Sequence, residues 1–214
     1  MRPCVLEVER RFSGLTLLLL TRCAGSPPFA FLRPLTPTMM HDVYFDTRDD
    51  GTGLLSANGV WVRQRNGHWQ AKLGKGGDLT NSRFHELLHV SDIAACIRRI
   101  LPSTATAADL KEDDNFGLVP MADFTTLRES WAADIDFTIV RDTTDFNHQV
   151  GKVELQVSLP GDASEEAKTA KMREMDERIR AFMGRYHWAF VPGEPVGKLT
   201  AWFVLQRLKK NWTS

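Results

Sequence analysis

A length of 214 residues suits one large domain or two small ones and allows a sizeable buried core. The 27 basic and 27 acidic residues give a formal net charge of zero, which argues against duplex nucleic acid, because such a partner usually attracts a basic surface. The three cysteines form no Cys-x-x-Cys pair, so we expect Cys4, Cys23 and Cys96 to be reduced thiols in a cytoplasmic protein.

The first predicted strand, Val5–Phe12, places charged residues at alternate positions. One side carries Val5, Glu7, Glu9 and Arg11, and the other carries Leu6, Val8, Arg10 and Phe12. Taken alone, this pattern is most simply an ordinary strand with its charged side in water. Because later strands repeat the pattern, we interpret it as part of a closed sheet with a charged interior.

The apolar run Leu15–Leu20 is too short to span a bilayer, which takes about 20 apolar residues. Glu7 and Glu9 stand where a signal peptide would carry positive charge, so we expect neither secretion nor a membrane partner. Leu15–Arg22 could form a short buried helix instead, which the breaker residues Gly25–Pro28 would end.

Alternating runs predict further strands, and two of them form a hairpin. The predicted strands are His41–Thr47, Val60–Arg65, His68–Leu73, Arg83–Leu88, Phe124–Ala132, Asp134–Arg141 and Val150–Val157, with loops at Gly74–Asp78 and at residues 103–116. The link Asn66-Gly67 between the second and third of these runs is the strongest short-range signal for a β-hairpin. In this hairpin Trp61, Arg63 and Arg65 share one face.

Helical periodicity and capping signals predict helices at Ser91–Leu101, Ser164–Tyr186 and Lys198–Leu208. Roughly eight antiparallel strands with two or three helices favour a closed β-barrel with flanking helices, an α+β fold, over an open sheet. No internal repeat and no sharp boundary divides the chain, so we expect one domain over residues 1–214, and a monomer.

The charges at alternating strand positions have both signs. The acidic ones are Glu7, Glu9, Glu86, Asp142 and Glu154, and the basic ones are Arg11, Arg63, Arg65, Lys72 and Arg128. Buried unpaired charge is costly, so a barrel lined in this way must hold something that neutralises both sets. A polyphosphate with Mg²⁺ fits, because Arg and Lys bind phosphate oxygens and clustered carboxylates bind the cation. The expected chemistry is phosphoryl transfer to water.

Two other features are less specific. Trp61 lies on the Arg63 face and could offer a ring to a flat cationic substrate, although packing is an equally good explanation. His85 and His89 are four residues apart on a predicted strand or its exit, so we assign them no metal.

These motifs resemble the CYTH superfamily, the triphosphate tunnel metalloenzymes, and within it the thiamine-triphosphatase branch. The segment Glu7–Phe12 is similar to the Glu-x-Glu-x-Lys signature of that family. Supporting segments are Val43–Thr47, Trp61–Arg65, Trp69–Lys72, Phe84–Glu86, Arg128–Trp131, Asp142–Phe146, Val150–Glu154, Gly197–Leu199 and Leu205–Arg207. Only residues 13–40 and 103–120 lack a clear counterpart.

The resemblance implies an eight-stranded tunnel and Mg²⁺-dependent hydrolysis of a small triphosphate. It implies metal binding by Glu7, Glu9 and Glu154 with Asp142 as an additional ligand, and phosphate binding by Arg11, Arg63, Arg65, Lys72, Arg128 and Lys198. Trp61 would stack on the thiamine ring system and Glu86 would organise the basic residues. Lys72, assisted by Tyr44, would act near the attacked phosphorus.

Three positions depart from the family pattern. Arg11 replaces the usual Lys, with a larger, forked head group. Lys152 occupies a position that resembles a metal carboxylate, where a cation should weaken Mg²⁺ binding, and Val140 stands where the branch often has Asp.

Three functions follow as hypotheses. The leading one is a Mg²⁺-dependent hydrolase that converts thiamine triphosphate to thiamine diphosphate and phosphate. The second is an inorganic tripolyphosphatase, which needs the tunnel but not the aromatic ring of Trp61. The third is a protein that binds polyphosphate or nucleotide without cleaving it, because Lys152 weakens the metal site.

Overall fold

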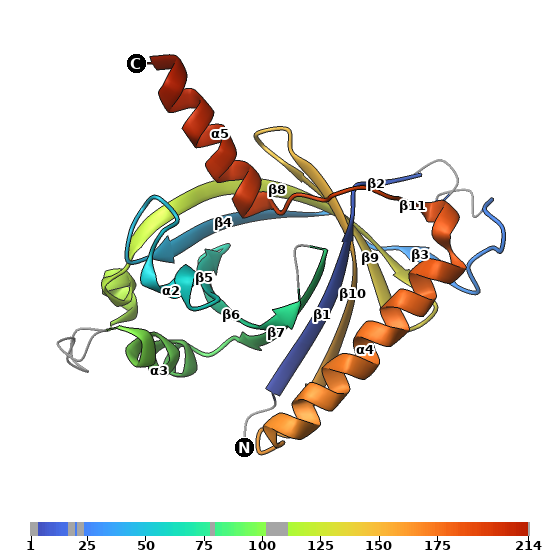
Figure 1. The fold of residues 1–214 in the computed structure, drawn as a ribbon, viewed down its shortest axis with the longest axis horizontal. Coiled ribbons are helices and arrows are strands. Elements are labelled where there is room, and N and C mark those ends of the chain that lie inside the picture. The colour runs from blue at the N-terminus through green and yellow to red at the C-terminus, as the bar shows by residue number, and fades with distance from the viewer. Residues whose placement is uncertain (1–3, 17–19, 21–23, 78–79, 102–110, 214) are drawn as a thin grey trace.

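The computed structural model describes residues 4–16, 20, 24–77, 80–101 and 111–213. Eight strands form a closed antiparallel barrel with flanking helices, which confirms the predicted fold class (Figure 1). The strands are β1 (Cys4–Phe12), β4 (Thr38–Asp46), β5 (Val60–Arg65), β6 (His68–Gly77), β7 (Asn81–Leu87), β8 (Val119–Ala133), β9 (Phe137–Thr144) and β10 (Gln149–Leu159). Their order around the barrel is β8-β4-β5-β6-β7-β1-β10-β9, and the pairing of β9 with β8 closes it.

Shorter elements surround the barrel. They are the strands β2 (Gly14–Leu15), β3 (Leu32–Pro34) and β11 (Phe190–Val191), the helices α2 (Leu54–Ala57), α3 (Val90–Ile100), α4 (Glu165–Arg185) and α5 (Lys198–Thr213), and the 3₁₀ helices η1 (Glu112–Gly117) and η2 (His187–Ala189). β3 pairs with the end of β8, and β2 pairs with β11 in a separate two-stranded sheet. The predicted helices at α3, α4 and α5 are therefore confirmed.

The β5–β6 hairpin forms as its sequence predicts. Arg65 is paired with His68, so Asn66 and Gly67 make a two-residue turn. Both turn residues have positive φ, 49° and 79°, as a type I′ turn requires. The Oδ1 of Asn66 also accepts a hydrogen bond of 2.8 Å from the backbone N–H of His41, which ties the turn to β4.

The outer face of β1 is apolar except for Arg10 and lies under α4 (Figure 1). Leu6 and Val8 are fully buried there, in one cluster with Met175 and Ile179 of the helix. Since successive side chains of a strand point to opposite faces, burying Leu6 and Val8 outside turns the charged residues of β1 inward.

Polar contacts cap the start of α4 and join the middle of the helix to the barrel. The Oγ of Ser164 accepts a hydrogen bond of 3.2 Å from the backbone N–H of Ala167, so the predicted helix start is confirmed. Further along, Asp176 accepts hydrogen bonds from Arg10 at 2.9 Å and from Arg83 at 3.0 Å. These two arginines lie on β1 and β7, so α4 is joined to neighbouring strands of the barrel.

A second apolar cluster packs α2 and α3 against the β5–β6 hairpin. Ile93 and Ile97 of α3 are fully buried in it, together with Leu55 of α2. Phe116 of η1 joins the same cluster and lies edge-on to Trp69, with ring centroids 4.8 Å apart. In contrast, α5 packs on the barrel with Leu199, Trp202 and Phe203 of its first turns, and its C-terminal end projects away from the barrel, as Figure 1 shows.

The structure changes three expectations about the connecting segments. The loop expected at Gly74–Asp78 is wrong as far as Gly77, because β6 continues through a register shift in its pairing with β7. The loop expected at residues 103–116 is wrong from residue 112 onward, where η1 buries Phe116. Most of the helix expected at Leu15–Arg22 lies outside the described residues, and Leu15 itself belongs to β2.

Cys4 and Cys96 are free thiols, and burial raises the pKa of each, in agreement with the expected reduced state. Cys23 lies outside the described residues. Of the helices in the described part of the chain, none is long and apolar enough to cross a membrane.

Candidate active site

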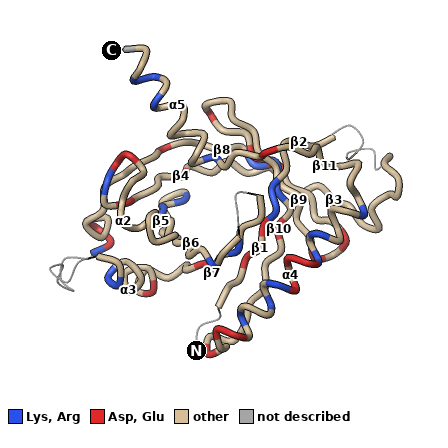
Figure 2. Tube along the Cα trace, viewed as in Figure 1, with Lys and Arg blue, Asp and Glu red and all other residues tan. Residues whose placement is uncertain are grey.

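The barrel encloses a cavity of about 650 Å³, within the range of about 300 to 1,000 Å³ typical of small-molecule sites. All thirteen residues predicted for the site line it: Glu7, Glu9, Arg11, Tyr44, Trp61, Arg63, Arg65, Lys72, Glu86, Arg128, Asp142, Glu154 and Lys198. The predicted charged interior is therefore confirmed, whereas the individual roles stay predictions. Figure 2 shows that both signs of charge occur on β1 and its neighbours as well as along α4 outside.

Three carboxylates gather on the wall formed by β1 and β10. Glu9 is directly opposite Glu154 in the antiparallel ladder, and Glu7 follows on the same face of β1. One carboxylate oxygen of each lies within 4.8 Å of the others, so this acidic trio could hold a cation. Glu7 and Glu9 are only 2% and 3% exposed. The predicted acidic cluster is present.

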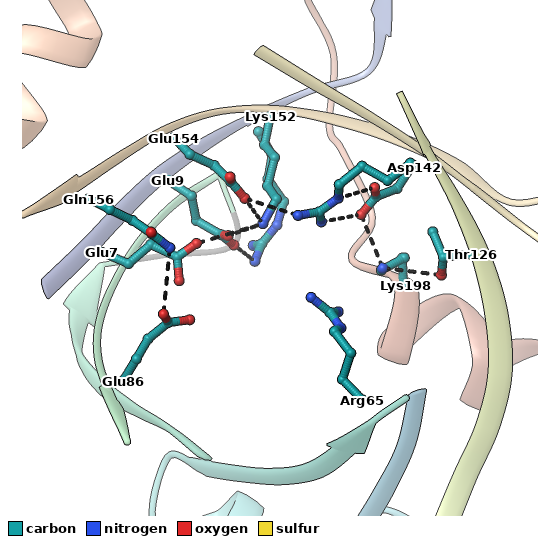
Figure 3. A network of polar contacts seen from close by, with 12 residues as sticks. Glu7, Glu9, Arg65, Glu86, Thr126, Asp142, Lys152, Glu154, Gln156 and Lys198 are labelled. Atoms are coloured by element: carbon teal, nitrogen blue, oxygen red, sulfur yellow. Dashed lines mark hydrogen bonds and ion pairs between the residues drawn. The ribbon is translucent and has the colours of Figure 1, made fainter. Parts of the chain in front are cut away.

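The ammonium group of Lys152 lies among these carboxylates (Figure 3). Its Nζ is 2.6 Å from Glu9 Oε2 and 3.9 Å from Glu7 Oε1, and it also forms a close ion pair with Glu154. Burial disfavours the charged amine, but Glu154 and Glu9 outweigh it and raise the pKa of Lys152. Burial likewise opposes ionisation of Glu9, whose pKa Lys152 nevertheless lowers. For Glu7, burial dominates and raises the pKa.

Lys72 connects the acidic trio to the facing strands. It lies opposite Glu86 in the β6–β7 ladder, with Nζ 3.2 Å from Glu86 Oε1, and it forms a close ion pair with Glu7. Burial alone would raise the pKa of Glu86, but Lys72 lowers it. The predicted organising role of Glu86 is consistent with this contact. Figure 3 shows Glu86 and Arg65 pointing into the cavity from the side opposite Glu9 and Glu154.

Asp142 sits among basic residues beside the trio. Arg128 donates from Nε and Nη2 to its two carboxylate oxygens, both at 2.8 Å, and the Nζ of Lys198 is 3.0 Å from Oδ2. Burial opposes ionisation of Asp142, but the Arg128 hydrogen bonds outweigh it and lower the pKa. Arg128 also lies 3.8 Å from Glu154 Oε1. The predicted role of Asp142 as a metal ligand stays a prediction, since both of its oxygens are engaged by Arg128.

The two arginines of β5 have different partners. Arg65 donates to both oxygens of the fully buried Asp42 at 2.7 Å. Arg63 donates from Nε and Nη2 to Gln70 Oε1, at 3.0 and 2.8 Å, and from Nη1 to the Tyr44 hydroxyl at 3.2 Å. The hydrogen-bond acceptors of Arg63 are thus neutral groups, and its Nε is 3.9 Å from Asp42 Oδ1, so its charge is less closely paired than that of Arg65.

Two further predicted residues, Arg11 of β1 and Trp61 of β5, also line the cavity. Arg11 donates to Ser82 Oγ at 3.2 Å and forms a close ion pair with Glu9. Trp61 lines the cavity and lies edge-on to Phe84, with ring centroids 5.8 Å apart.

Tyr44 and Lys72, the predicted catalytic residues, have separate partners. The Tyr44 hydroxyl accepts from Arg63, whereas Lys72 pairs with Glu7 and Glu86. Burial would raise the pKa of Tyr44, but the nearby Arg63 lowers it. Assistance of Lys72 by Tyr44 therefore stays a prediction.

Sequence reasoning missed several polar residues in or directly behind the cavity wall, among them Asp42, Gln70 and Thr126. Asp42 shares strand parity with Tyr44, Gln70 shares it with Lys72, and Thr126, which accepts from Lys198 at 3.2 Å, shares it with Arg128. Parity alone could have identified all three. Asp46 shows the limit of that signal, because it has the parity of Asp42 but accepts backbone hydrogen bonds at the start of α2, from Leu55 and Ser56 N–H at 2.9 Å.

Two solved structures are similar to this chain in fold. One is a candidate adenylate cyclase from Vibrio parahaemolyticus, with 12% identity, a TM-score of 0.50 and coverage of 94% of this chain and 98% of that one. The other is the PH1819 protein from Pyrococcus horikoshii OT3, with 13% identity, a TM-score of 0.50 and coverage of 95% and 99%. A search of curated proteins found no match.

The family model of the CYTH domain matches residues 33–185. The matched segment leaves out β1, which carries Glu7 and Glu9, but β1 pairs on both sides with strands inside it, β7 and β10. Because the match extends over most of the chain, the protein belongs to the CYTH domain family.

Proposed function

We infer that this chain hydrolyses the terminal phosphate of a small organic triphosphate, in the first instance thiamine triphosphate, giving thiamine diphosphate and phosphate. One observation carries this inference: a cavity of about 650 Å³ is lined by eight basic and five acidic side chains, and one positive charge is still in excess after Arg65 and Arg83 are paired with Asp42 and Asp176 behind the wall. A polyanion is the guest that such a wall favours.

The basic residues are placed to take phosphate oxygens. Arg63 is the strongest candidate, because its hydrogen bonds go to the neutral groups of Gln70 and Tyr44 and its ion-pair partner Asp42 is 3.9 Å away. A phosphate oxygen there would replace neutral hydrogen bonds by charge-assisted ones, which are roughly twice as strong. Arg128 of β8 and Lys198 of α5 would bind a second phosphate group.

The reaction needs little covalent chemistry from the protein. A water oxygen attacks the terminal phosphorus, the bond from that phosphorus to the bridging oxygen breaks with its electron pair on the diphosphate, and the proton from the water passes to a product phosphate oxygen or to solvent, which yields orthophosphate and the diphosphate. Catalysis then comes from positioning and from stabilising charge in the transition state. We assign this to Lys72 and Tyr44 together with the arginines of the wall.

Trp61 supports an organic rather than an inorganic triphosphate. Its ring lines the cavity on the strand that carries Arg63 and Arg65. A flat cationic ring such as that of thiamine gains about 0.5 to 2 kcal/mol from an aromatic face. An inorganic tripolyphosphate would gain nothing from it.

The resemblance also implies Mg²⁺, and Glu7, Glu9 and Glu154 are the residues that would hold it. In this structure the Lys152 ammonium already lies among their oxygens. The arrangement therefore does not fit a divalent ion at the trio unless Lys152 moves. Mg²⁺ dependence stays a prediction from the family.

The position of Lys152 also favours a second candidate function, in which the chain binds a triphosphate without cleaving it. Phosphate release from thiamine triphosphate, tripolyphosphate and ATP, each with Mg²⁺ and with EDTA, separates the candidates. We expect thiamine triphosphate to be cleaved fastest. ATP is included because of the activity named for the Vibrio neighbour. Binding of all three without phosphate release would overturn the hydrolase in favour of the binding protein.

A further inference from the structure

Lys152 occupies the position at which a bound cation would meet the acidic trio. It lies on β10 between Arg11 of β1 and Val140 of β9, each directly opposite it in the ladder. These are the three positions that depart from the family pattern, and the structure places them in one row across three neighbouring strands. The row therefore adds two cations and an apolar side chain next to the trio, and no carboxylate.

The contacts of Lys152 are those of a bridging cation. An ammonium has three N–H donors and no acceptor; here it pairs closely with Glu9 and Glu154, whereas Glu7, at 3.9 Å, is beyond hydrogen-bond distance, so the third N–H can reach a phosphate oxygen. Mg²⁺ requires oxygens at about 2.0 to 2.1 Å. It could not share these oxygens with an ammonium group 2.6 Å from Glu9, because the two cations would overlap and repel.

Each carboxylate of the trio also has another cationic partner. Arg11 pairs with Glu9, Lys72 pairs with Glu7, and Arg128 lies 3.8 Å from Glu154. The negative charge of the trio is thus compensated by side chains alone. A divalent ion would add positive charge where none is needed, whereas an anionic guest would be attracted by the surplus.

We propose that Lys152 takes the place of the divalent cation, so that this chain binds its triphosphate without a metal ion. The ammonium group bridges the acidic trio and the phosphate oxygens of the guest. The identity of the guest rests on the function proposed above, but the metal independence of binding does not require that the guest be cleaved.

Binding of inorganic tripolyphosphate, measured by titration calorimetry in EDTA and in excess Mg²⁺, tests the proposal. We expect the dissociation constant of the wild-type chain to differ by less than about threefold between the two conditions. Lys152→Met should weaken binding in EDTA by about 10- to 100-fold, the usual effect of losing a charge-assisted hydrogen bond, and Mg²⁺ should restore part of it. Lys171→Met, on the outer side of α4, is the matched control and should behave as wild type.

A second measurement uses Mn²⁺ alone, followed by its paramagnetic resonance spectrum. We expect no saturable Mn²⁺ site in the wild-type chain and a new one in Lys152→Glu. If Lys152→Glu does not fold, Lys152→Met and the wild type still decide the question. A wild-type chain that binds tripolyphosphate only with Mg²⁺, or that binds Mn²⁺ as well as Lys152→Glu does, would overturn the proposal.

Phosphate release separates this proposal from the proposed function. Binding in EDTA without phosphate release would support the role of Lys152 and reject the hydrolase. Phosphate release from a chain that binds tripolyphosphate only when Mg²⁺ is present would support the hydrolase and reject the role of Lys152.

Discussion

The two faces of the barrel wall differ in what they stabilise. On the outer face of β1, Leu6 and Val8 are sealed under α4, and their burial stabilises the fold. On the inner face, Glu7 and Glu9 are almost as deeply buried, but among ion pairs. Buried ion pairs contribute little net stability, because desolvation offsets their attraction. One strand thus serves stability on one side and ligand binding on the other, and the two can be perturbed separately.

The largest effect on activity is expected from removing the Arg128 side chain on the inner face. Arg128→Ala leaves Asp142 with Lys198 as its cationic partner and removes a phosphate-binding group. We expect phosphate release to fall by about 100-fold or more, whereas the unfolding free energy should fall by only about 1 to 3 kcal/mol, because Lys198 still pairs with Asp142. Steady-state kinetics and denaturant unfolding measure the two effects.

The control for this variant is Arg141→Ala on β9. Arg141 pairs with Glu129 on the partly exposed side, where an ion pair contributes at most about 1 kcal/mol. Equal turnover in Arg128→Ala and Arg141→Ala would show that the inner face does not bind the substrate.

Breaking the outer face at Ile179 should affect stability alone. Ile179→Ala removes a fully buried side chain between α4 and β1, so we expect the unfolding free energy to fall by about 2 to 5 kcal/mol. Titration calorimetry on the folded variant should give the wild-type affinity for tripolyphosphate. A large loss of affinity would mean that the two faces are coupled.

Removing the ring of Trp61 distinguishes the binding of an organic triphosphate from that of an inorganic one. We expect Trp61→Ala to weaken thiamine triphosphate binding by about 3- to 30-fold, the loss of one cation–π contact, and to leave tripolyphosphate binding unchanged. Competition between the two ligands measures the difference directly. Equal losses for both would identify Trp61 as a packing residue against Phe84.

Acid should remove the stability that the Arg128–Asp142 ion pair contributes on the inner face. Arg128 and Lys198 lower the pKa of Asp142 despite its burial, so this group stabilises the fold above its unfolded pKa of about 3.9. That stability is lost as pH falls through the lower folded pKa. Thermal unfolding from pH 5 downward should therefore show a smaller loss in Asp142→Asn than in wild type. Parallel curves for the two proteins would count against the Arg128–Asp142 pair.

Much of the fold follows from local sequence signals. Asn66-Gly67 requires the turn that the structure shows, and Ser164 caps the helix that it precedes. Alternation along β1 was enough to turn Glu7 and Glu9 inward, because only the opposite side could be buried under a helix. The same alternation on later strands brought the other predicted residues into one cavity.

Other features depend on contacts between distant parts of the chain. Phe116 is buried by Trp69 and α3, which no pattern near residue 116 indicates. Which cation reaches which carboxylate depends on the register of β1, β9 and β10. The sequence predicted that Lys152 should weaken a metal site, but only the register shows that its ammonium group reaches the whole trio.

Titration of the wild-type chain and of Arg63→Ala with thiamine triphosphate tests most directly whether the charged interior holds a triphosphate. Arg63 is 8% exposed, so a ligand that contacts it must enter the cavity. We predict saturable one-to-one binding by the wild type and at least about tenfold weaker binding by the folded variant, the loss expected for a charge-assisted hydrogen bond. Absence of binding to the wild type, or equal affinity in both proteins, would contradict the account.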